Sequence, residues 1–280
     1  MFKILAKKIL ASGIKLFEIE APLVARKALP GQFIVLKIDE YGERIPLTIY
    51  EYTRDKGTIS IIFQEVGKST MQLGTLNEGD CLSDIIGPLG CPTKIEKVGR
   101  VVTIGGGVGT AVIYPITRSL KEANNRVTSI IGARTRELLI LKEEMEKASD
   151  ELFITTDDGS YGRHGLVTDE LKRLIDEGEK IDLIFAIGPV IMMKAVSNLA
   201  KQYNLKTMVS LNSIMVDGTG MCGCCRVTVK GRTKFVCVDG PDFEAEGVDF
   251  DELMNRQRIY LNEERLSIER YRERECRRNG

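Results

Sequence analysis

The sequence of 280 residues has no tryptophan and only one histidine, His164. A metal site built on several histidines is therefore excluded. An excess of charge of one sign is also missing, because 40 Lys and Arg balance 40 Asp and Glu. Such a chain has no overall field to gather nucleic acid or anionic lipid, so we expect neither nucleic acid nor a membrane as a partner.

Long apolar runs are absent as well. No uncharged stretch reaches the roughly 18 residues of a membrane-spanning helix, and lysines interrupt the opening MFKILAKKIL, which therefore does not resemble a signal peptide. We expect a soluble cytoplasmic protein whose cysteines stay reduced. In that setting a cluster of cysteines is more typical of a metal site than of disulfides.

Three kinds of residue pattern follow one another along the chain and predict an α/β plus β protein. Over residues 1–97, short β-type runs such as GQFIVLKI and GTISIIFQEV, separated by glycine, proline and charged turns, predict an antiparallel β-barrel. Over residues 98–210, runs such as VVTIG and RVTSIIGAR alternate with helical stretches, which predicts a Rossmann-like parallel sheet. A small cysteine domain over 211–245 and a charged, helical tail over 246–280 complete the division.

The cysteine segment MVDGTGMCGCCRVTV has the spacing Asp217-x4-Cys222-x2-Cys225, with Cys237 further on. Three cysteines at this spacing are typical of a plant-type [2Fe–2S] loop, in which a carboxylate here replaces the first thiol. The glycines between these positions supply the backbone conformations that a loop needs to curl round a cluster. We therefore predict Asp217, Cys222, Cys225 and Cys237 as the ligands.

Three alternatives to this ligand set stay open. Zinc accepts cysteine and aspartate, but its structural sites usually pair two C-x-x-C knuckles and only one exists here. Free buried cysteines would leave the crowding of thiols in a glycine-rich loop without a reason. Cys224 could replace Asp217, although the offset of Asp217 fits the ferredoxin spacing better. Cys81, Cys91 and Cys276 are interpreted as structural or incidental thiols.

A glycine loop, IGGGVGT, lies between a predicted strand and a predicted helix. Bare N–H groups at a helix N-terminus suit a pyrophosphate, although tight strand-to-helix packing would explain the same glycines. A nucleotide loop and an iron–sulfur site in one chain require a flavin between them, because a one-electron cluster does not accept hydride. We expect the barrel to hold that flavin.

The order of RIPLT, VGKST, GPLG, GGGVG, DDGSYG, AIGPVIMMKAV and the cysteine loop resembles the ferredoxin reductase superfamily in the form with a C-terminal [2Fe–2S] domain. That group includes the electron-transfer subunits of dihydroorotate dehydrogenase. With aspartate first in the loop, the chain is most similar to the small subunits of electron-bifurcating NADH-dependent reduced ferredoxin:NADP oxidoreductases. The resemblance implies FAD, a [2Fe–2S] cluster and NAD(H), and a heterodimer with a larger flavin- and iron–sulfur-bearing subunit that handles ferredoxin and NADP(H).

The resemblance also assigns cofactor-binding residues, and it implies no catalytic nucleophile, acid or base. For FAD these are Arg44, Pro46, Leu47, Thr48, Ile62, Phe63, Gln64, Gly67, Ser69 and Thr70. For the nicotinamide nucleotide they are Gly106, Gly107, Val108, Gly109, Thr110, Gly188, Pro189 and Met192.

The choice of nucleotide and the identity of the enzyme each have an alternative interpretation. Arg134 and Arg136 follow the second strand where an acid would bind ribose, which suits NADP, whereas the resemblance implies NAD(H) and Glu137 could serve instead. An electron-transfer subunit of dihydroorotate dehydrogenase is the rival enzyme, although its group has an all-cysteine loop. A non-catalytic metal-binding module is the rival outside enzymes. Asp157, Asp158 and His164 are interpreted as loop residues without a catalytic role.

Overall fold

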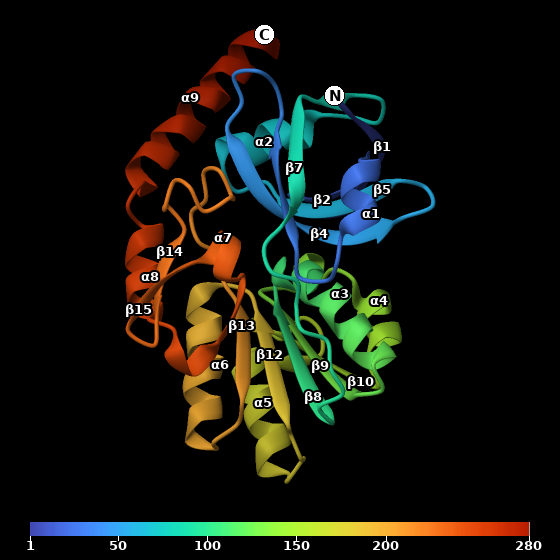
Figure 1. Cartoon of the computed structure of the whole chain (residues 1–280), viewed down its shortest axis with the longest axis vertical. Coiled ribbons are helices and arrows are strands. Elements are labelled where there is room, and N and C mark those ends of the chain that lie inside the picture. Colours follow the sequence, from blue (N-terminus) through green and yellow to red (C-terminus); the bar gives the residue numbers. More distant parts are fainter. Residues whose placement is uncertain (280) are drawn as a thin grey trace.

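The computed structural model describes residues 1–279, with side chains up to Arg274. Cys276 is therefore outside the residues whose side chains are described. No helix of residues 1–279 is both long and apolar enough to cross a membrane. Figure 1 shows two main bodies, a β-rich one near the N-terminus and an α/β one, with the C-terminal part running along one side of both.

The N-terminal body is a nearly closed antiparallel barrel, as predicted. Its seven strands follow the order β6-β1-β2-β5-β4-β3-β7, and every neighbouring pair is antiparallel. Buried isoleucines and phenylalanines fill its interior, because alternate residues of each strand point inward. The elements are β1 Phe2–Ala11, β2 Ile14–Glu20, α1 Pro22–Lys27, β3 Phe33–Lys37, β4 Arg44–Thr53, β5 Thr58–Gln64, α2 Lys68–Thr75, β6 Cys81–Leu82 and β7 Asp84–Leu89.

The second body is the predicted parallel α/β sheet, with the order β11-β10-β9-β8-β12-β13-β16. All pairs are parallel except the last, β13 with β16. Helices α3 and α4 lie on one face and α5 and α6 on the other (Figure 1). The elements are β8 Arg100–Gly106, α3 Gly109–Glu122, β9 Arg126–Ala133, η1 Arg136–Leu138, α4 Lys142–Ala148, β10 Glu151–Thr156, β11 Arg163–His164, α5 Val167–Asp176, β12 Leu183–Ile187, α6 Val190–Gln202 and β13 Thr207–Ser210.

The cysteine segment does not stand apart from the sheet. Its last strand adds antiparallel to β13, and the helix that follows buries Phe250 and Leu253 in the same core as Val190 and Met193. The division of residues 98–280 into three separate units remains a prediction. The elements are β14 Arg226–Val229, β15 Arg232–Phe235, α7 Val236–Asp239, β16 Asp242–Glu244, η2 Ala245–Gly247, α8 Phe250–Gln257 and α9 Leu261–Asn279.

Polar and aromatic contacts join the two bodies. Tyr50 of the barrel stacks on Tyr114 of α3 with ring centroids 5.1 Å apart, and Arg118 binds Glu51 at 2.8 Å. Burial raises the pKa of the Tyr114 phenol above its usual value. These contacts set the barrel above the carboxyl ends of the parallel strands, where ligands of open α/β sheets bind.

Candidate functional site

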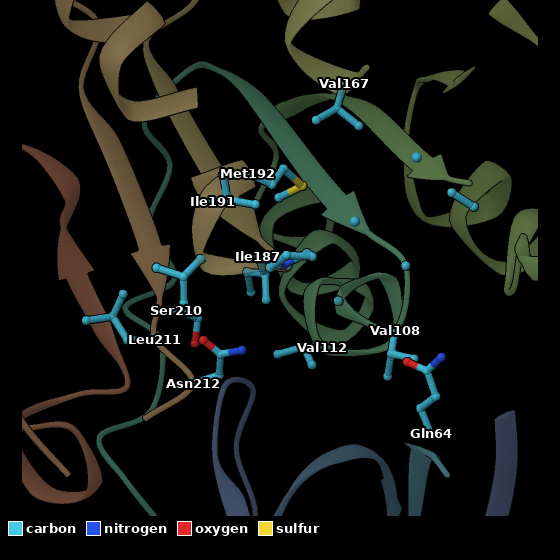
Figure 2. Close-up of a pocket in the computed structure, with 18 of the residues that line it drawn as sticks. Gln64, Val108, Val112, Val167, Ile187, Ile191, Met192, Ser210, Leu211 and Asn212 are labelled. Carbon is cyan, nitrogen blue, oxygen red and sulfur yellow. The ribbon is translucent and has the colours of Figure 1, made fainter. Parts of the chain in front are cut away.

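A cavity of about 920 Å³ lies between the barrel, the carboxyl ends of the parallel strands and the segment after β13. In Figure 2, Gln64 from the barrel and Val108 from the glycine loop border the same space as Ser210 and Asn212. The predicted cofactor residues that line it are Pro46, Leu47, Thr48, Gln64, Gly106, Gly107, Val108, Gly109, Gly188, Pro189 and Met192. Barrel and sheet residues predicted for two different cofactors therefore meet in one cavity.

The glycine loop combines an open surface with tight packing. A Cβ atom at Gly107 would meet nothing within 4 Å, and this residue has a φ of 56°, which favours glycine. A Cβ at Gly109 would instead lie 2.3 Å from the carbonyl oxygen of Ile187, and one at Gly106 would lie 2.4 Å from Met192 Sδ. Thr110 is buried and does not line the cavity. The loop is thus both pressed onto β12 and open towards the cavity, which fits a nucleotide's phosphates.

The barrel contributes Pro46 to Thr48 of β4 and Gln64 of β5 to the cavity wall. Ile62 and Phe63 point away from the cavity wall into buried clusters, and the Phe63 ring packs edge-on against Phe17 with centroids 5.1 Å apart. If these two residues contact FAD, as predicted, they must do so through backbone atoms. Arg44 is exposed at the start of β4 and does not line the cavity.

The N-terminus of α2 lies outside the cavity lining and already binds an anionic group. Ser69 Oγ donates to the carboxylate of Glu43, and Lys68 Nζ lies 3.8 Å from the same carboxylate. Thr70 Oγ1 accepts from the backbone N–H of Gly67 at 3.0 Å. The Glu43 oxygens stand in for phosphate oxygens here, so the donors fit the diphosphate predicted for them.

The residues weighed for nucleotide choice are placed differently. Arg134 lines the cavity, whereas the Arg136 guanidinium lies over the Tyr161 ring at 5.6 Å. Glu137 does not line the cavity. Of the loop residues interpreted as non-catalytic, Asp157 lines the cavity and Asp158 Oδ1 accepts from Ser160.

One wall of the cavity was missing from the sequence-based prediction. It consists of Ser210, Leu211, Asn212, Ser213 and Met215, which directly follow or end β13. The available clue was the position of this stretch at the carboxyl end of a parallel strand. Of the remaining residues interpreted as structural, His164 and Cys81 are exposed, and Cys91 Sγ donates to the carbonyl of Val238 at 3.1 Å.

The four predicted cluster ligands form two pairs. Cys225 Sγ and Cys237 Sγ lie 3.1 Å apart in a buried position, which is too far for the roughly 2.05 Å of a disulfide. Asp217 accepts hydrogen bonds from the backbone N–H groups of Cys222 and Thr219, both at 2.8 Å. The loop that carries these residues turns through glycines with positive φ, as at Gly220 with 88°.

Two pairs of donors match the two irons of a [2Fe–2S] cluster. Among the residues that the structure describes, no three His, Cys, Asp or Glu side chains converge on a single point. Zinc requires four donors round one ion, whereas a [2Fe–2S] cluster takes two donors at each iron. Cys224 donates its backbone N–H to Cys222 Sγ at 3.5 Å, and its carbonyl accepts from Arg256.

The pKa shifts of three predicted ligands differ in direction. The backbone N–H of Thr219 lowers the pKa of Asp217, and the backbone N–H of Cys224 lowers the pKa of Cys222. Burial, followed by the hydrogen bond with Cys225, raises the pKa of Cys237 to about 12. Because thiolates bind metals, metal binding by Cys237 is expected to release a proton.

The fold and the cavity define the class of protein, a ferredoxin reductase-like electron-transfer protein. Residues 103–198 match the oxidoreductase NAD-binding domain, and residues 212–249 match the iron–sulfur cluster binding domain of dihydroorotate dehydrogenase B. The chain also shares the fold of a cytochrome P450 reductase from Amycolatopsis, with a TM-score of 0.62, 21% identity, and coverage of 72% of this chain and 65% of that one.

More similar relatives identify the family. A Thermotoga maritima homologue of the electron transfer subunit of dihydroorotate dehydrogenase B is 47% identical over 96% of this chain and 95% of its own. An uncharacterised Clostridium beijerinckii protein is 50% identical over 94% and 92%. A solved structure of an NADH-dependent reduced ferredoxin-NADP oxidoreductase, described for flavin-based electron bifurcation, matches with a TM-score of 0.93 and 45% identity over 97% and 98%. The chain belongs to this family of electron-transfer subunits and their homologues.

Several sequence-based predictions are thereby confirmed. The chain is an oxidoreductase electron-transfer subunit of the ferredoxin reductase superfamily, and FAD, a [2Fe–2S] cluster and NAD(H) are its cofactors. The roles of the individual cofactor-binding residues remain predictions, as does the ligand set of the cluster.

Proposed function

We propose that this chain is the small subunit of an electron-bifurcating NADH-dependent reduced ferredoxin:NADP oxidoreductase. Support comes from the similarity over almost the whole chain to a structure of that enzyme. The observation that carries the proposal is the carboxylate of Asp217, which accepts the backbone N–H of Cys222 and would be the first ligand of the cluster. A larger flavin- and iron–sulfur-bearing partner would handle NADPH and ferredoxin, and the free thiols of the loop suit the reducing cytoplasm.

The residues of this chain would bind and orient cofactors. Bound here, FAD exchanges a hydride with NAD(H) and single electrons with the cluster. Pro46, Leu47, Thr48 and Gln64 would hold the flavin ring from the barrel side, and the α2 N-terminus would bind its diphosphate. The glycine loop, with Gly188, Pro189 and Met192 opposite it, would bind the nicotinamide nucleotide in the same cavity and keep water from the reacting atoms.

The exposed side of the cluster loop would face the partner subunit. Cys222 is exposed there, beside Met221, whose exposed fraction is 89%. Val216 and Val238 add exposed apolar surface to the same small domain. A partner that covers this surface would shield the cluster and bring its own electron carrier close.

The decisive experiment is anaerobic purification of the native complex, followed by visible and low-temperature EPR spectra with each electron donor. We expect NADH to bleach flavin absorbance in the isolated chain and to produce a reduced [2Fe–2S] signal. In the complex, we expect NADPH to reduce the partner. Reduction of the complex by dihydroorotate instead would identify the rival dehydrogenase, and a colourless, zinc-containing chain would contradict the proposal.

A Met221→Glu variant tests the docking surface. The new charge would have to be desolvated against the partner, so we expect at least a tenfold weaker complex with unchanged flavin and iron content. Ile9→Glu, on the exposed side of β1, is the matched control and should assemble normally.

A further inference from the structure

Asp242 holds together three segments that are far apart in the sequence. It begins β16, where it pairs with Ser210 of β13, and its Oδ2 accepts from Thr93 Oγ1 at 2.5 Å. Thr93 belongs to the connection that leaves the barrel. The two residues directly beside the carboxylate, Ser210 across the strands and Pro241 before it in the chain, both line the cavity.

The second oxygen of this carboxylate is enclosed without a hydrogen bond. Among the described side chains, only Asp242 Oδ1 and Ser213 Oγ are enclosed polar atoms that lack a partner, and Ser213 lines the cavity. The groups that face Asp242 from the other two segments are the neutral hydroxyls of Thr93 and Ser210, and no charged side chain shifts its titration. A carboxylate in such a place gains little from its surroundings when it is ionised.

The titration of Asp242 agrees with this geometry. Burial raises its pKa to about 6, against the opposing effects of the hydrogen bond from Thr93 and of the neighbouring Ser210 hydroxyl. The raised pKa brings protonation of Asp242 nearer to neutral pH, and the carboxylate lies directly behind two residues that line the cavity.

We propose that Asp242 is a positioning residue for the electron chemistry of the cavity, one that takes up a proton when an electron enters and releases it when the electron leaves. The inference rests on the proposed function, because the cavity must hold a redox cofactor. The balance is simple: one electron arrives from the donor, one proton arrives from solvent, and one O–H bond forms on the carboxylate. Added negative charge on a cofactor in the cavity favours the protonated form of Asp242. By linkage, the protonated form favours the reduced cofactor by the same free energy.

The test is a redox titration of the flavin-loaded chain at several pH values, compared with Asp242→Asn, which resembles the neutral acid. For the wild type we expect an additional change of slope in midpoint potential near pH 6, and its loss in the variant. At pH values well above 6 the variant should have the higher potential, because it lacks the buried negative charge. An identical pH dependence in the two proteins would overturn the inference.

Two further measurements keep this result interpretable if Asp242→Asn folds poorly. Thr93→Val retains the acid but removes a hydrogen bond to its charged form, so the change of slope should move to higher pH; an unmoved change of slope would count against Asp242.

Without flavin, the wild-type free energy of unfolding should fall as pH rises from about 4 through about 6, since the folded pKa is the raised one. If the free energy of unfolding decreases in this pH range but the chain binds no flavin, the proposed function is disproved. If the chain binds flavin but its stability does not decrease in this range, only the role of Asp242 is disproved.

Discussion

Two glycine-rich loops of this protein use glycine for different physical reasons. In the nucleotide loop, Gly109 removes a Cβ that would lie 2.3 Å from the carbonyl oxygen of Ile187, so it permits close packing between regular elements. In the cluster loop, Gly220 and Gly223 have positive φ values of 88° and 67° and lie in irregular backbone. At Gly109 close packing requires the glycine, whereas at Gly220 and Gly223 the backbone conformation favours it.

The strongest test of this comparison is a pair of substitutions within the nucleotide loop. Gly109→Ala should cost about 3 kcal/mol of stability, because a backbone oxygen of β12 cannot move aside easily. Gly107→Ala has open space round the new methyl group and should cost only about 1 kcal/mol, from its positive φ. Thermal unfolding measures both, and equal costs would refute the packing role of Gly109.

The cluster loop should divide into a buried and an exposed half. Cys225→Ser places a hydroxyl in a buried position and should cost about 2 kcal/mol of stability in the cluster-free protein, with loss of the cluster. Cys222→Ser, at an exposed position, should lose the cluster with a change below about 0.5 kcal/mol. Iron content and chemical denaturation give the two quantities. Comparable destabilisation by both variants would mean that the halves do not differ.

The identity of the fourth ligand can be decided by a matched pair. We expect Asp217→Ala to lose iron, because in the predicted ligand set its carboxylate, which accepts the backbone N–H of Cys222, is the fourth donor. Cys224→Ser should keep its iron and its visible spectrum. The opposite pattern would show that Cys224 is the ligand and that the loop rearranges when the cluster binds.

The smallest expected effect concerns the anion site at α2. Glu43 places a carboxylate on Ser69 and beside Lys68, where it would compete with a flavin diphosphate. Glu43→Gln should therefore lower the dissociation constant for FAD about fivefold, equivalent to about 1 kcal/mol. Glu40→Gln, an exposed residue of the same connection, is the control. Weaker binding by the Glu43 variant would show that this carboxylate supports the site.

Local patterns explain why the main architecture could be predicted from the sequence. Strand and helix periodicities gave the barrel and the parallel sheet, and ligand spacing gave the cysteine loop. In strand β1 the lysines of AKKIL obscure the alternating pattern, and Ile4 is a buried anchor. Helix α2 has only eight residues, and one of them is a glycine, Gly74, so no helical period stands out in the sequence. Short elements carry too few residues to show a period.

By itself, the sequence determined the class of fold, the cofactors and the positions of the two glycine-rich loops, because these depend on the chemistry of residues close together in the chain. Only the tertiary structure decided which side chains meet. It turned Phe63 into the barrel and brought Ser210 and Asn212 to the cavity. It also joined β16 to the parallel sheet and enclosed Asp242 between Thr93 and Ser210. These outcomes depend on packing between segments separated by about 30 to 150 residues, and no local pattern records such packing.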